Sequence, residues 1–83
     1  MRKIKESIQK LNSFDYVYLD NKRMKQIVLN PSDEIEIILE DKKIIVFSIS
    51  EILKIINYRN LIIFKREKGF IIFKITKIND NQL

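Results

Sequence analysis

Residues 61–77 read LIIFKREKGFIIFKITK, two alternating apolar segments joined by a short polar one. A glycine between such segments is typical of a β-hairpin, because glycine readily adopts the positive φ that a tight turn requires. We expect a two-residue turn at Lys68-Gly69, which sets Phe64 opposite Phe73. One face of this hairpin is then aromatic and aliphatic, whereas the other mixes lysine with isoleucine.

The segments before the hairpin predict an α+β domain. Apolar residues spaced i, i+4 and i+7 indicate an amphipathic N-terminal helix, and period-two alternation indicates strands. The expected elements are a helix over 2–13, strands over 15–20, 21–30, 34–40 and 43–48, a short helix over 48–58, and hairpin strands over 61–67 and 70–77. Residues 21–30 also fit a helix, and we favour the strand. The fold class is therefore α+β, with a mainly antiparallel sheet of five or six strands and two helices.

The second helix is predicted from its first residues. Ser48-Ile49-Ser50-Glu51 has the spacing of a capping box, in which the serine and the glutamate each bond the backbone of the other. The apolar residues that follow at positions 52, 53, 55 and 56 have helical spacing.

Composition excludes several kinds of chemistry. The chain has 83 residues, enough for a single domain, and we expect residues 79–83 to form a frayed tail. It contains no Cys or His. Zinc sites built from Cys or His, thiol catalysis and imidazole-dependent triads are therefore excluded. A single glycine cannot form a glycine-rich phosphate loop. We expect no enzymatic activity, no cofactor and no bound metal.

The same composition bears on source and location. No apolar stretch is long enough for a membrane span or a signal peptide, so we expect a cytoplasmic protein that does not bind membranes. The abundant Ile, Lys and Asn residues have AT-rich codons. That bias favours a phage, a plasmid or another mobile element as the source.

Basic residues make nucleic-acid binding the main functional hypothesis. Sixteen Lys and Arg against eleven Asp and Glu leave a formal charge of +5, and lysines gathered on one surface bind phosphates by releasing counterions. The expected binding residues are Lys65, Arg66, Lys68, Lys74 and Lys77 of the last hairpin and Lys22, Arg23 and Lys25 of the first. A third basic group lies on the first helix, at Arg2, Lys3, Lys5 and Lys10. A basic hairpin of this kind can follow a duplex groove, so we favour DNA over RNA as the ligand.

Two hypotheses about a protein partner remain open. Ile38, Ile63 and Ile72 point away from the expected core, so a second layer or a partner chain must cover them, and we expect a homodimer. Alternatively, the protein is a small phage-type inhibitor, similar in size to anti-CRISPR proteins, that binds a host nuclease or defence complex. Tyr16 and Tyr18 share one strand face, where they either stack bases or pack against neighbouring side chains.

Residues 29–46 are similar to part of a known family. Leu29–Ile37 and Glu40–Val46 resemble the second half of AbrB-type swapped-hairpin DNA-binding domains. Ser32 and Lys42 stand where that family has glycines, and the short helix expected before the motif is not evident. The sequence is therefore not assigned to the family.

Overall fold

The computed structural model describes residues 2–76, and the predicted site residue Lys77 and the predicted tail at 79–83 lie outside them. The elements in chain order are α1 (Arg2–Asn12), β1 (Val17–Leu19), β2 (Lys22–Leu29), β3 (Glu34–Leu39), β4 (Ile44–Ser48), the 3-10 turn η1 (Ile49–Glu51), β5 (Ile52–Tyr58), β6 (Leu61–Arg66) and β7 (Gly69–Ile75). The α+β class, the N-terminal helix and the antiparallel sheet are confirmed. The predicted strand at 21–30 is also confirmed, as β2.

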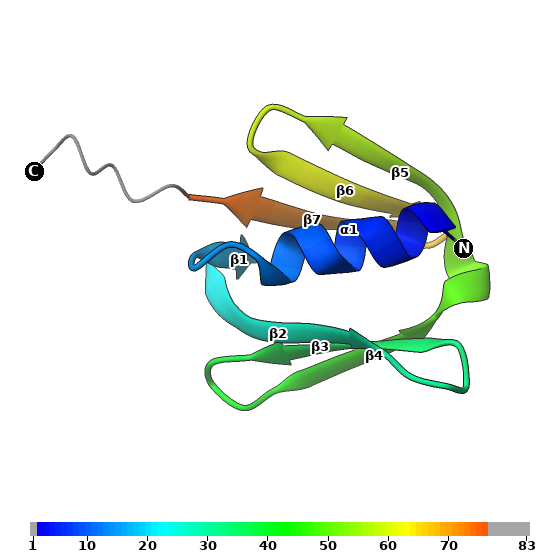
Figure 1. The fold of residues 1–83 in the computed structure, drawn as a ribbon, viewed down its shortest axis with the longest axis horizontal. Coiled ribbons are helices and arrows are strands. Elements are labelled where there is room, and N and C mark those ends of the chain that lie inside the picture. The colour runs from blue at the N-terminus through cyan, green and yellow to red at the C-terminus, as the bar shows by residue number, and fades with distance from the viewer. Residues whose placement is uncertain (1, 77–83) are drawn as a thin grey trace, which may run out of the picture.

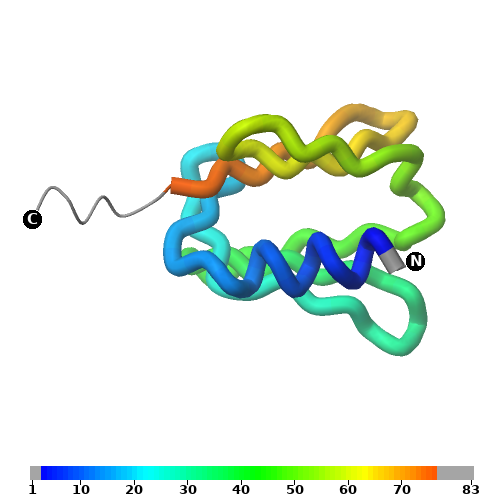
Figure 2. The backbone as a smooth tube through the Cα atoms, turned by 45° about the horizontal axis from the view of Figure 1, so that its top comes forward, coloured from blue at the N-terminus to red at the C-terminus, as the bar shows by residue number. Residues whose placement is uncertain are grey.

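The strands form one antiparallel sheet in the order β4-β3-β2-β1-β7-β6-β5. Its two edge strands, β4 and β5, are consecutive in the chain and are joined only by the three residues of η1. The sheet therefore curls until its edges approach each other at that end. Figure 1 shows the resulting two arms, β2–β3–β4 and β5–β6–β7, with α1 running lengthwise between them. In Figure 2 the backbone passes between the arms through β1 and β2 on one side and through η1 on the other.

The inner face of the curled sheet and one face of α1 form the core. Strand alternation places every second side chain inside. Ile4, Ile8 and Leu11 of the helix are buried against these side chains, as the spacing predicts. At the centre Phe64 makes edge-to-face ring contacts with Phe73, at 5.2 Å between centroids, and with Phe47 of the other arm, at 6.3 Å. These contacts join the two arms through the middle of the core.

Strand β2 bends where it passes from one arm to the other. The pairing with β3 shifts between Met24 and Gln26, which is a bulge, and bulges sharpen the local bend of a strand. Just beyond it, the Asn12 side chain donates to the Ile27 carbonyl at 2.7 Å and accepts from the Ile27 N–H at 3.0 Å. The amide of Asn12 therefore takes the place of a strand partner beside the short β1 and holds the end of α1 to the sheet.

The predicted second helix is wrong. The capping box forms, because the Glu51 carboxylate accepts from the Ser48 N–H at 3.1 Å, but it opens only the single turn η1. The following residues belong to β5, and a bulge between Ile52 and Lys54 shifts their register against β6. This bulge turns Ile52 and Ile55 to the same side, toward the core. It therefore reproduces on a strand the three-residue spacing of a helix. The sheet gains a strand and has seven rather than five or six.

The last hairpin exists, but its predicted register is wrong. Arg66 pairs with Gly69, so the turn consists of Glu67 and Lys68, and Phe64 stands opposite Ile71 rather than Phe73. The displacement is two residues, which leaves every side chain on its predicted face. Gly69 has a φ of +120° and begins β7. The division of the hairpin into a buried apolar face and an outer mixed face is confirmed.

Replacing Phe64 and Phe70 separately by alanine tests this division. Phe64 is fully buried, whereas Phe70 is 57% exposed. We expect Phe64→Ala to lower the free energy of unfolding by about 3–5 kcal/mol, because it opens a cavity in the core. Phe70→Ala changes it by less than about 1 kcal/mol. Urea denaturation followed by circular dichroism measures both, and equal losses would contradict the two-faced hairpin.

Candidate functional site

The outward-facing side chains of β5, β6 and β7 form a continuous surface, here called the outer surface. Pairing across the three strands arranges them in three rows. The first row is Lys54, Lys65 and Phe70, the second is Ile56, Ile63 and Ile72, and the third is Tyr58, Leu61 and Lys74. The third row continues onto β1 and β2 through Tyr18 and Arg23. Since α1 packs on the opposite face of the sheet, it does not cover this surface (Figure 1).

Two lysines of the outer surface are paired across adjacent strands, without acidic neighbours in the rows. Lys54 and Lys65 are directly opposed on adjacent antiparallel strands, an arrangement that is destabilising for like charges. No Asp or Glu occupies an outward-facing position of β5, β6 or β7, all of which lie within the described part of the chain. An anion bound between these two lysines would relieve their repulsion.

Aromatic and aliphatic side chains occupy the rest of the outer surface. Phe70 is 57% exposed, Tyr58 is 55% exposed and Ile72 is 41% exposed, while Ile56 and Ile63 are half-buried. An exposed apolar patch rimmed by polar groups is typical of an interaction site. The sheet thus presents an apolar centre with lysines at its rim.

Further basic residues lie beyond the third row of the outer surface. Lys74 also lines a hollow of about 600 Å³ between the end of α1 and the β5–β6 turn, together with Lys10 and Arg59. Its lining also includes Phe14 and Ile75, and no acidic residue of the described range 2–76 lines it. Three basic residues from three separate elements therefore surround this end of the outer surface.

The predicted basic residues of the last hairpin lie on both faces of the sheet. Lys65 and Lys74 lie on the outer surface, and Lys68 is exposed in the adjoining turn. Arg66 instead faces inward: its side chain is 24% exposed, pairs with Glu51 at 3.5 Å and lies over the Phe47 ring at 5.7 Å. Arg66 thus joins β6 to η1 and β4 and is not part of the outer surface.

Two of the three predicted basic residues of the first hairpin are engaged with carboxylates, whereas Lys25 is exposed. Lys22 pairs with Asp41 at 3.3 Å, and Arg23 pairs with Glu40 at 2.9 Å. Arg23 also donates to the Asp15 carbonyl and covers the Tyr16 ring at 4.6 Å. These pairs neutralise most of the charge that the sequence places there.

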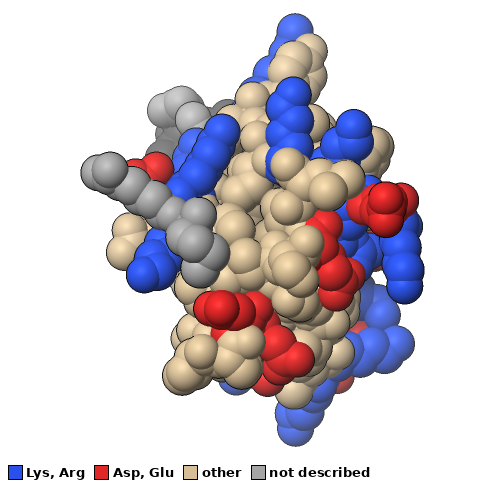
Figure 3. Space-filling model, turned by 90° about the vertical axis from the view of Figure 1, so that its right-hand side faces the viewer, with Lys and Arg blue, Asp and Glu red and all other residues tan. Residues whose placement is uncertain are grey.

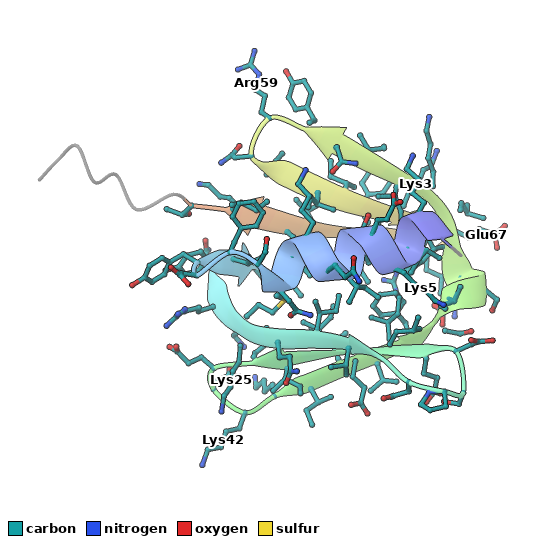
Figure 4. The ribbon with its side chains drawn as sticks, in the orientation of Figure 1. Lys3, Lys5, Lys25, Lys42, Arg59 and Glu67 are labelled. Atoms are coloured by element: carbon teal, nitrogen blue, oxygen red, sulfur yellow. The ribbon has the colours of Figure 1, made fainter. Side chains whose placement is uncertain are left out.

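Other basic side chains point elsewhere. Lys25 and Lys42 project from the far arm, and Lys3 and Lys5 project from α1 (Figure 4). At the end of the molecule shown in Figure 3, Lys and Arg project around most of the outline, and Asp and Glu lie among them and across the lower middle. Charges of both signs alternate there, so that end offers no uniformly cationic surface.

Among the members of the outer surface that sequence reasoning missed are Lys54, Tyr58 and Phe70. The first two lie on the segment that helical spacing assigned to a second helix. Phe70 was assigned to the hairpin strand without a role in binding. The signal for β5 was its enrichment in β-branched residues with an aromatic end, which favours a strand over a helix.

The described residues restrict other kinds of site. Within residues 2–76 no group of three or more acidic side chains is arranged to hold a metal ion. The helix in this part of the chain is too short and too polar to cross a bilayer. Comparisons with protein-family models, with curated proteins and with solved structures give no match for this chain.

The ion pair of Asp41 predicts a pH dependence of stability. The backbone N–H of Lys43, which donates to Asp41 at 3.0 Å, and then the Lys22 ammonium lower the pKa of the Asp41 carboxyl below its ordinary value of 3.8. A lowered folded-state pKa adds stability above the unfolded value, and acidification through the folded pKa removes it. We therefore expect wild type to be more stable than Asp41→Asn at neutral pH, with a difference that shrinks below pH 3.8.

Urea denaturation at about pH 6 and about pH 2.5 measures this difference. Asp33→Asn serves as the matched control, because Asp33 is exposed and takes part in none of the ion pairs found among residues 2–76. A difference for Asp41→Asn that stays constant with pH would contradict the assignment.

Proposed function

We propose that this chain is a non-enzymatic nucleic-acid-binding protein, encoded by a phage or another mobile element, and that the outer surface of β5, β6 and β7 is its contact surface. The opposed pair Lys54–Lys65 carries the proposal. Two lysines held face to face on an exposed sheet, without an acidic neighbour in the rows, are unfavourable in the free protein. They are favourable beside a phosphate backbone.

Electrostatics supports a backbone contact of moderate strength. Lys54, Lys65 and Lys74 stand on one face, so one extended polyanion can reach all three. Each phosphate neutralised releases condensed counterions, and the affinity then depends on salt concentration. Pairing of Lys22 and Arg23 with carboxylates leaves the outer surface as the main cationic surface of the sheet.

A protein partner is the second candidate, and one observation favours it. The central row of Ile56, Ile63 and Ile72 is apolar, and β4 exposes Ile44 and Val46 on the other arm. Such surfaces fit a phage-type inhibitor that covers part of a host complex, or a second copy of this chain. Binding to a purified host complex without affinity for free nucleic acid would favour this candidate.

Neutralising the lysines tests the proposed function. We expect Lys54→Gln/Lys65→Gln/Lys74→Gln to lower the affinity for oligonucleotides. It should also reduce the slope of log affinity against log salt by about 2, since each phosphate contact contributes about 0.7 on a single strand. Fluorescence anisotropy over a range of salt concentrations measures both quantities.

A matched control removes the same charge elsewhere. Lys3→Gln/Lys25→Gln/Lys42→Gln changes three exposed lysines of α1, β2 and the β3–β4 turn, away from the outer surface (Figure 4). Its affinity should stay near that of wild type. Equal losses in the two triple variants, or no binding by wild type at low salt, would refute the proposal.

A further inference from the structure

We infer that the nucleic acid on the outer surface is single-stranded, with its bases lying on the aromatic and isoleucine side chains and its phosphates at the lysines. This inference rests on the proposed function and names the substrate class of that site. It differs from the hypothesis, made from the sequence, that the basic hairpin lies in the groove of a DNA duplex.

The central row decides against a duplex. A duplex presents charged phosphates along its exterior and keeps the faces of its bases stacked inside. Docking one on the outer surface would place Ile56, Ile63 and Ile72 against phosphates or water, and no favourable burial would result. An unpaired strand exposes base faces that this apolar row can cover.

The exposed rings of Tyr58 and Phe70 and the half-buried ring of Tyr18 are placed for contacts with separate bases. Tyr58 and Tyr18 occupy the same row three strands apart, which is about 14 Å at the usual strand spacing. Phe70 lies on β7 in the first row, four residues from Lys74 and hence about 13 Å away along the strand. The separations exclude stacking of the three rings on one another. Each ring is therefore free to accept a different base.

Neighbouring residues distinguish the aromatics that are available from those that are engaged. Tyr16 is half-buried, and the Arg23 guanidinium lies 4.6 Å from its ring centroid, so Tyr16 is excluded from the site. The Arg59 guanidinium lies 5.3 Å from the Tyr58 ring centroid and points outward (Figure 4). Tyr58 is nevertheless 55% exposed and open to a base, and Arg59 adds a cation beside it. Phe70 has no such cover among the described cation–ring contacts.

Phosphates and bases alternate along a strand, and the outer surface alternates in the same way. The lysine pair of the first row stands beside Phe70, and Lys74 of the third row stands between Leu61 and Tyr18. Base stacking on aromatic rings tolerates any sequence, because every base has a flat face. The site therefore binds single strands with little sequence preference.

Replacing the aromatics by leucine tests the inference. Leucine keeps an apolar side chain at positions 58 and 70 but removes the ring, so any loss reports stacking rather than burial. We expect Tyr58→Leu/Phe70→Leu to bind a 12-nucleotide single strand of mixed sequence at least about fivefold more weakly than wild type. Wild type should bind that strand at least about tenfold more tightly than the matching duplex at about 0.15 M salt. Val46→Ala, which changes an exposed apolar residue of β4 on the other arm, is the matched control and should bind like wild type.

The outcomes separate the inference from the proposed function. If the duplex binds as tightly as the single strand, or if the leucine variant is unchanged while the lysine variant is weakened, the single-strand assignment fails and the proposed function stands. If the lysine variant also binds like wild type, both fail. A circular dichroism spectrum and a urea midpoint for each variant confirm that it is folded.

Discussion

The shortness of the link between β4 and β5 is the constraint on which the rest of the structure depends. These strands form the two edges of the sheet, yet only Ile49–Glu51 separates them along the chain. A flat sheet of seven strands would place its edges about 29 Å apart, farther than three residues can span. The sheet must therefore curl, and its inner face becomes the core. The contact between Phe47 and Phe64 and the pairing of Arg66 with Glu51 hold the curled form at the end where the edges meet.

Curling gives the two faces of the sheet opposite roles. The inner face is filled by aromatic and aliphatic side chains and by α1. The helix therefore cannot cover the outer face, where Ile72 and Phe70 stay exposed beside opposed lysines. Exposed apolar side chains and unrelieved like charges both raise the free energy of the isolated protein. A polyanion with apolar bases compensates for both at once, which is why the outer surface suits a nucleic acid.

Local patterns predict much of this fold. The helical periodicity predicts α1 within two residues at either end, from residues 2–13. The period-two alternation predicts β3 and β4 equally well, from residues 34–40 and 43–48. Even a hairpin register displaced by two residues leaves the side chains on the correct faces, because the period of a strand is two. The capping box at Ser48 forms as its spacing predicts, although it opens only one turn.

The failures arise from features that local patterns do not report. A bulge beside Lys54 gives a strand the spacing of a helix, and only pairing with β6 distinguishes the two. The same error left Lys54 and Tyr58 out of the predicted binding site, since both belong to that strand. The engagement of Arg66 with Glu51 and of Arg23 with Glu40 joins residues distant in sequence, so charge counts along the chain overstate the number of available cations.

The most direct measurement is a two-dimensional NMR titration of the isotope-labelled chain with a short single-stranded oligonucleotide. Binding at the outer surface would shift the amide signals of β5, β6 and β7, together with the side-chain signals of Tyr58, Phe70 and Lys65, and would leave those of Lys25 and Lys42 in place. Shifts confined to β3, β4 and α1, or no shifts at a saturating oligonucleotide concentration, would contradict a nucleic-acid contact on this face of the sheet.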